Sequence, residues 1–296
     1  MTAVLSQVFA PGLFTLPFMV HAWAAASLVA IASSLVGFFV IVRGSAFTAH
    51  AVPRAAFAGA AAAFLIGTST LLGLAVCAFA MALALAVLDR GQGERGVLTA
   101  LLLVAALGLG DLLLTVAGAY QPAVYALLFG QVVGISAGQV VQIAALSALA
   151  VAAFAFLYRP LLMITAVPET AQARGVPATG MRLAFLALVA LTAALTVPVV
   201  GALLAFSLMV APAAAASRIA RTPARALAWS VGIALGTVWA ALVIAYDTGL
   251  PIGFAVSSLG TLAYAGARLA SARTPAHRHH HTQHAVAAPA EVAAGR

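Results

Sequence analysis

Nine runs of mainly apolar residues follow one another along this chain, separated by short gaps. A helix needs about 20 such residues to cross a bilayer, and most of these runs approach that length. The runs are continuous, whereas the strands of a membrane barrel alternate apolar and polar residues, so helices are expected. The sequence therefore predicts an all-α polytopic membrane protein with about nine (eight to nine) transmembrane helices. The predicted spans lie near residues 18–42, 45–68, 69–88, 97–118, 138–158, 182–198, 200–217, 226–246 and 252–270.

Composition agrees with this prediction, because 65% of the residues are hydrophobic and 7% are charged. A soluble domain carries about 25% charged residues, so most of this surface is expected to face lipid. The basic residues are all arginine, and they exceed the acidic ones by a formal net charge of +8. In a soluble chain that excess would suggest nucleic acid. Here the arginines stand at the ends of apolar runs, so we expect a lipid membrane and no nucleic acid.

The arginines also predict the orientation of the chain. If nine helices cross, the arginines between and after the runs all fall on one side of the membrane. The positive-inside rule makes that side cytoplasmic, with the N-terminus outside and the C-terminus inside. These residues are Arg43, Arg90, Arg95, Arg159, Arg174, Arg182, Arg218, Arg221, Arg225, Arg268, Arg273 and Arg278.

The stretch 182–217 is too long for one crossing, since about 36 helical residues would extend about 54 Å. Arginines stand at both ends of this stretch, so both ends are expected on the same face of the membrane. We therefore expect two helices or half-helices joined near Pro198 and Gly201, residues that interrupt a helix. An eight-helix arrangement with one short re-entrant segment remains an alternative.

The chain divides into a predicted transmembrane domain, residues 1–272, and a cytoplasmic tail, residues 273–296. The tail is polar and alanine-rich, and we expect it to be disordered. Its dense imidazole cluster can bind zinc, copper or nickel without a fold, as a metal sink or sensor. Neutral low-complexity drift is the alternative. The cluster consists of His277, His279, His280, His281 and His284.

Three stretches, taken together, resemble the membrane permeases of ABC transporters for zinc, manganese and iron uptake, the ABC-3 type. They are RGSAFTAHAVPRAAFAGAAAAFLIG, PETAQARGVP and VVGALLAFSLMVAPAAAASR, and the similarity runs from about residue 17 to 270. The resemblance implies a homodimer in the plasma membrane of a bacterium. It also implies a cytoplasmic ATP-binding-cassette ATPase and an extracytoplasmic metal-binding protein as partners.

ATP hydrolysis is expected to belong to that separate ATPase. A phosphate-binding loop of the GxxxxGK[ST] kind needs a lysine, and this chain has none. We therefore expect neither enzymatic activity nor a tightly bound cofactor, only transported zinc or manganese.

PETAQARGV is predicted to form a short cytoplasmic helix. Pro168 suits the first helical position, Glu169 suits the positive end of the helix dipole, and Gly175 ends the helix. In the family that this chain resembles, the loop docks into the ATPase and passes its motion to the membrane helices. By that resemblance the coupling residues are Pro168, Glu169, Ala171, Ala173 and Gly175. A solvated connector between helices is the alternative.

The stretch VVGALLAFSLMVAPAAAASR holds Gly201 and Pro212 among many small residues. Small side chains let helix backbones approach closely in lipid. We expect tight helix packing here, either near a dimer interface or along the translocation path, or as structural packing alone.

The expected translocation path contains His50, Arg54, Asp111 and Gln131. By the resemblance, the family carries an aspartate where His50 stands, a histidine at Arg54 and an acid at Gln131. His50 can still bind a metal ion, but the guanidinium of Arg54 has no lone pair to offer. All three departures remove negative charge or metal-ligand character, and Arg54 would favour an anion, a chelate or a carboxylate over a bare cation.

Three interpretations of Arg54 stay open. It can pair with Asp111, an acid inside an apolar run, since charges within a membrane usually find partners. It can line the pathway and set selectivity. It can also lie at the cytoplasmic interface if Pro53 breaks the helix.

The sequence thus favours a permease subunit that moves a divalent metal, with zinc or manganese as the best choice. A permease for a chelated metal, such as a siderophore-like or cobalamin-like compound, is one alternative. An ion-coupled secondary carrier that uses Asp111 as its proton site is another.

Overall fold

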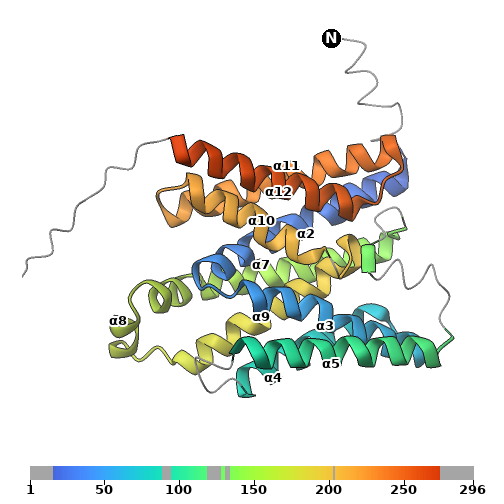
Figure 1. The fold of residues 1–296 in the computed structure, drawn as a ribbon, viewed down its shortest axis with the longest axis horizontal. Helices are drawn as coiled ribbons and strands as arrows, with labels where there is room; N and C mark the ends of the chain where they lie inside the picture. Colours follow the sequence, from blue (N-terminus) through green and yellow to red (C-terminus); the bar gives the residue numbers. More distant parts are fainter. Residues whose placement is uncertain (1–15, 89–94, 119–127, 131–133, 203, 274–296) are drawn as a thin grey trace, which may run out of the picture.

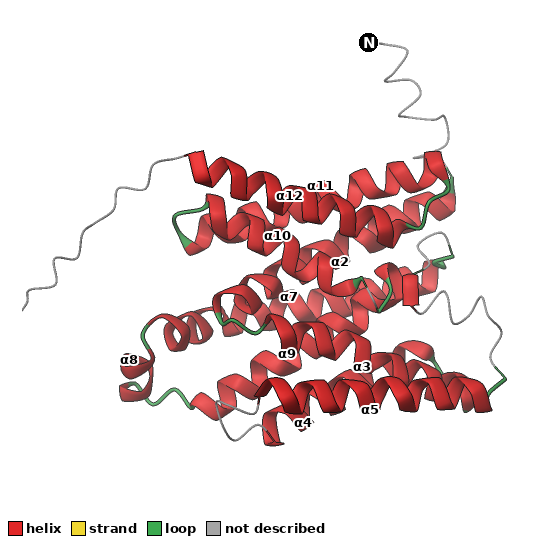
Figure 2. Cartoon of the chain, in the orientation of Figure 1, coloured by secondary structure: helices red, strands yellow, loops and turns green. Residues whose placement is uncertain are grey.

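The computed structural model describes residues 16–88, 95–118, 128–130, 134–202 and 204–273. Within these ranges the chain is helical and contains no strand (Figure 2). The helices are α2 (Pro17–Val42), α3 (Ala46–Leu65), α4 (Thr70–Leu88), α5 (Arg95–Val116), α7 (Ala137–Ala166), α8 (Pro168–Ala173), α9 (Ala178–Val200), α10 (Ala205–Ile219), α11 (Pro223–Thr248) and α12 (Ile252–Arg273).

The all-α prediction is confirmed for the described part of the chain, and each of the nine predicted spans overlaps a helix. The count of about nine crossings is not confirmed. By length and composition six of the described helices can cross a membrane: α2, α4, α5, α7, α9 and α11. The other three helices that overlap predicted spans are α3, α10 and α12, and their sequences explain why they are not counted. α10 has only 15 residues, α3 contains His50, Pro53 and Arg54, and α12 contains arginines, serines and glycines.

The helices form two groups around a central core (Figure 1). One group packs α3 against α4 and α5, and the other packs α10 against α11 and α12. Between them lie α2, α7 and α9, of which α2 and α9 are the most completely buried spans. Such burial fits their sequences, because a helix that is apolar all round has no polar face to turn to water.

Hydroxyl groups link α2 to two of its neighbours, α9 and α11. The hydroxyl oxygens of Ser33 and Thr196 on α9 lie 2.9 Å apart, and the Ser230 hydroxyl of α11 donates to the Ser34 carbonyl at 3.1 Å. All four residues are fully buried or nearly so. Hydrogen bonds of this kind hold helices together in lipid, where hydrophobicity alone does not drive association.

The α3–α4 contact depends on two glycines. A Cβ placed on Gly59 would overlap the Gly73 carbonyl, and a Cβ on Gly73 would overlap the Gly59 carbonyl. The two backbones are therefore as close as glycine permits.

Gly59→Val is expected to lower the melting temperature of the purified protein by about 5 °C or more, because overpacking costs about 1–3 kcal/mol. Thermal unfolding in detergent measures the effect. Gly108→Val is the matched control, since nothing lies within 4 Å of that position. Equal melting temperatures for the two variants would contradict the close α3–α4 packing.

The stretch after Arg182 is interrupted where the sequence predicted. α9 contains Pro198 and ends at Val200, Gly201 follows with φ +91°, and α10 begins at Ala205. Gly130, with φ +81°, lies against the same bend: its Cβ would overlap the 199–201 backbone, and a Cβ on Gly201 would overlap the backbone of residues 128–130. The α9–α10 break and this second bend therefore pack backbone to backbone.

Candidate translocation path and coupling helix

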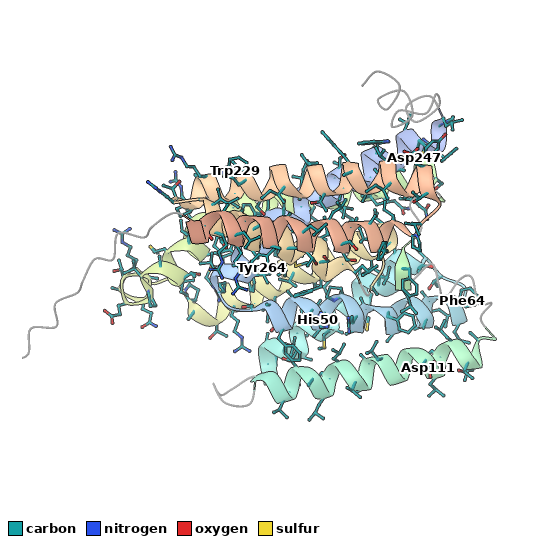
Figure 3. The ribbon with its side chains drawn as sticks, turned by 45° about the horizontal axis from the view of Figure 1, so that its top comes forward. His50, Phe64, Asp111, Trp229, Asp247 and Tyr264 are labelled. Atoms are coloured by element: carbon teal, nitrogen blue, oxygen red, sulfur yellow. The ribbon has the colours of Figure 1, made fainter. Side chains whose placement is uncertain are left out.

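His50 lies in the first half of α3, on the side that turns toward α10. Its ring and the Phe206 ring form a T-shaped pair, with 4.8 Å between the centroids and 88° between the planes. The flanking Ala49 and Ala51 are fully buried, whereas His50 is half-buried and Phe47 is exposed. The partly open face of α3 therefore carries the imidazole (Figure 3).

Arg54 shares this face, since residues four apart on a helix are neighbours. Its side chain is half-buried, and its buried Nε has no hydrogen-bond partner among the described residues. Pro53 lies within α3 and does not end it. The interpretation in which Pro53 breaks the helix and releases Arg54 to the interface is therefore wrong for this structure.

Asp111 does not lie against Arg54 in the structure. On α5, Gly110 faces α3, where its Cβ would meet Phe57 and Ala58 about one turn beyond Arg54. The next residue, Asp111, is exposed and makes no ion pair with Arg54, although both residues are described. The acid therefore lies on the outer side of the helix pair and not between its helices.

The described residues offer few metal ligands. No group of three or more His, Cys, Asp or Glu side chains comes together among them. Gln131 and the tail residues His277, His279, His280, His281 and His284 lie outside the described residues. His50 is therefore not part of a three-ligand metal site within the described part of one subunit.

The predicted short helix is present as α8. Pro168 occupies its first turn with Glu169, Arg174 caps its end, and Gly175 follows with φ +75°. Ala171 is fully buried because α8 packs on α7, while its other residues are exposed. Figure 1 shows α8 projecting at one end of the bundle. One face of α8 is thus anchored and the rest is free to meet another protein.

A cavity of about 630 Å³ lies at the opposite end of the bundle, between the ends of α3 and α9 and the beginnings of α4 and α7. Its polar lining consists of hydroxyls and amides, with no charged side chain among the described lining residues. These polar residues are Thr68, Ser69, Thr70, Gln139 and Gln142.

Sequence reasoning missed Phe206 as the neighbour of His50. The two residues lie on helices far apart in the chain, and no local pattern connects an imidazole to one phenylalanine among many. Gly201 and Pro212, which the sequence did single out, lie at the α9–α10 break and inside α10. Pro212 is buried, as expected for a packing residue.

Two transport proteins are similar to this chain in sequence. The manganese transport system membrane protein MntC of Halalkalibacterium halodurans is 28% identical over 180 residues, 60% of this chain and 62% of that protein. The high-affinity zinc uptake system membrane protein ZnuB of Haemophilus influenzae is 27% identical over 215 residues, 72% of this chain and 82% of that protein.

The fold is that of a solved structure, PsaBC from Streptococcus pneumoniae in complex with Fab. One of its chains superposes with a TM-score of 0.80 at 20% identity, over 90% of this chain and 95% of that chain. A family model, the ABC 3 transport family, matches residues 15–270. The apolar helices and this match together make the protein a multi-pass membrane protein. The chain belongs to the ABC 3 transport family.

Proposed function

We propose that this protein is the permease subunit of an ABC importer and forms the path for a divalent metal ion, zinc or manganese. The observation that carries the proposal is the family match over residues 15–270, with relatives named for zinc and manganese transport. The subunit is a permease and not an enzyme, and a separate cytoplasmic ATPase supplies the energy.

The proposed topology has nine crossings, with the N-terminus outside and the C-terminus in the cytoplasm. The positions of the arginines support this topology. Arginines lie at the ends of α2 and α10 and at the beginnings of α9 and α11, which are all on one side of the bundle. The α8 end of the bundle is then cytoplasmic, and the 630 Å³ cavity opens outside. Residues 1–272 form the permease domain, followed by the His-rich tail 273–296.

Each partner has a proposed place on this structure. The ATPase meets the exposed side of α8, through Pro168, Glu169, Ala173 and neighbours. The extracytoplasmic binding protein delivers cargo near the uncharged polar cavity. A second copy of the chain faces the α3 surface that carries His50 and Arg54, and its His50 adds a ligand to the one that this subunit supplies.

Arg54 favours a second candidate, a metal chelate as cargo. A guanidinium about 6 Å along the helix from His50 would repel a divalent ion by about 5 kcal/mol at an effective dielectric of about 20. Its Nε is buried without a hydrogen-bond partner among the described residues. The carboxylate or other anionic group of a chelate would neutralise the charge of Arg54 and accept a hydrogen bond from its Nε.

Zinc uptake into proteoliposomes that hold the permease, its ATPase and its binding protein tests the proposal. We expect ATP-dependent uptake by the wild type that falls to background without the ATPase. Arg54→His should raise the zinc rate at least tenfold, since it removes the repulsion described above. Arg54→Lys keeps the charge and should not raise the rate.

Two outcomes would change the assignment. Zinc and manganese uptake by the Arg54→His variant alone would favour the chelate as natural cargo. No ATP-dependent uptake of either metal by any variant, in liposomes where the ATPase copurifies with the permease, would refute metal-ion transport.

A further inference from the structure

The imidazole of His50 on α3 is in contact with the aromatic ring of Phe206 on α10. The centroids of the two rings are 4.8 Å apart and their planes differ by 88°. This separation falls within the range of about 4.5–7 Å that is typical of such pairs. The phenyl ring therefore occupies one side of the imidazole, and a metal ion has to approach the imidazole from another side.

No hydrogen bond orients the imidazole within the part of the chain that the structure describes. A histidine that binds a metal usually donates its second ring nitrogen to a carbonyl or a carboxylate, and that bond fixes the ring. The charge of Arg54, about one turn farther along α3, acts on His50 but does not fix its ring. Among the described contacts, the one with Phe206 restricts the orientation of the imidazole.

Phe206 lies in the first turn of α10, directly after the α9–α10 break. The N–H groups of Leu204 and Ala205 donate to the Gly201 carbonyl at 3.3 and 2.9 Å. Ala205 is fully buried, and Phe206 is half-buried. The position of the phenyl ring therefore depends on the backbone of the break, whereas the position of the imidazole depends on α3.

We propose that Phe206 is a positioning residue for His50 and holds the imidazole in the orientation that binds the transported metal ion. This inference rests on the proposed function, in which His50 is a ligand of that ion. Because Phe206 follows the break, a movement of the break that withdraws the phenyl ring releases the imidazole and weakens the site. The ion is then bound more tightly in one conformation of the permease than in the other.

Two substitutions separate orientation from packing. The interaction between perpendicular aromatic rings depends on their geometry, because the positive edge of one ring meets the negative face of the other. Leucine is apolar and bulky but has no such preference, whereas tyrosine keeps it. Phe206→Leu therefore removes the restriction on the imidazole, and Phe206→Tyr preserves it.

Visible absorption of Co²⁺ added to the full-length protein in detergent tests the proposal, since Co²⁺ accepts imidazole ligands as zinc does. The five histidines of the tail are replaced by alanine in every sample, because they can also bind the ion. The absorption that His50→Gln removes is assigned to His50. We expect Phe206→Leu to weaken the Co²⁺ affinity of this signal about fivefold, and Phe206→Tyr to keep the affinity within about twofold of the wild type.

Phe47→Leu is the matched control. Phe47 is exposed on the same face of α3, about one turn before His50, and its replacement should leave the Co²⁺ affinity unchanged. Equal affinities of the wild type and Phe206→Leu would overturn the positioning role and leave His50 as a ligand. A loss as large in Phe206→Tyr as in Phe206→Leu would also overturn it. A wild type without any signal that depends on His50 would refute the metal site itself, and the role of Phe206 with it.

Discussion

Ala171→Glu is expected to reduce ATP-driven uptake at least tenfold while the transmembrane bundle stays folded. Ala171 is the fully buried residue of α8, at its contact with α7. A carboxylate at this position would have to be buried without a partner, which is far more costly than releasing a six-residue helix. Under the proposed coupling, a released α8 would no longer transmit the motion of the ATPase to α7.

Uptake and ATP hydrolysis are measured in the same proteoliposomes. Loss of coupling stops uptake, whereas ATP hydrolysis can continue. Ala224→Glu is the matched control. It is exposed in the first turn of α11, at the same end of the bundle, where an acid is favourable. Normal uptake by Ala171→Glu would show that α8 does not couple the two proteins.

Gly201→Ala is expected to have the largest effect on stability. At φ +91° and ψ 153° Gly201 occupies a region that is essentially restricted to glycine and costs another residue about 1–3 kcal/mol. The added Cβ would also overlap the backbone of residues 128–130. Together these costs should lower the melting temperature by roughly 10 °C and reduce transport with it.

The control for this variant should have the opposite sign. Gly232→Ala lies inside α11 with nothing within 4 Å, so it should raise the melting temperature slightly. Thermal unfolding of both variants in the same detergent gives the comparison. A Gly201→Ala protein as stable as Gly232→Ala would mean that the α9–α10 break can relax into an ordinary helical link.

The helices and their breaks were predictable from the sequence because each depends on local properties. Apolar runs mark the long helices, Pro168 and Gly175 bound α8, and Pro198 with Gly201 marks the α9–α10 break. The number of crossings was less certain, since the polar residues of α3 and α12 make these helices ambiguous by composition.

The site was harder to predict because it depends on which faces of the helices meet. Asp111 and Arg54 were plausible partners by charge, yet Gly110 is the residue that α5 turns toward α3. In the sequence, Arg43 and Arg182 were interpreted only as separate indicators of the cytoplasmic side of the membrane. Only the packing of α2 beside α9 brings both to one cavity.

The adjacent serines of α2 have a mechanical consequence. Ser33 bonds to α9 and Ser34 accepts from α11, so consecutive residues of one helix tie it in two directions at the same level. α2 therefore links the central helix α9 to α11 of one outer group. Motion of α11 relative to α9 would have to pivot at this level or break a buried hydrogen bond, at about 1 kcal/mol for each bond lost.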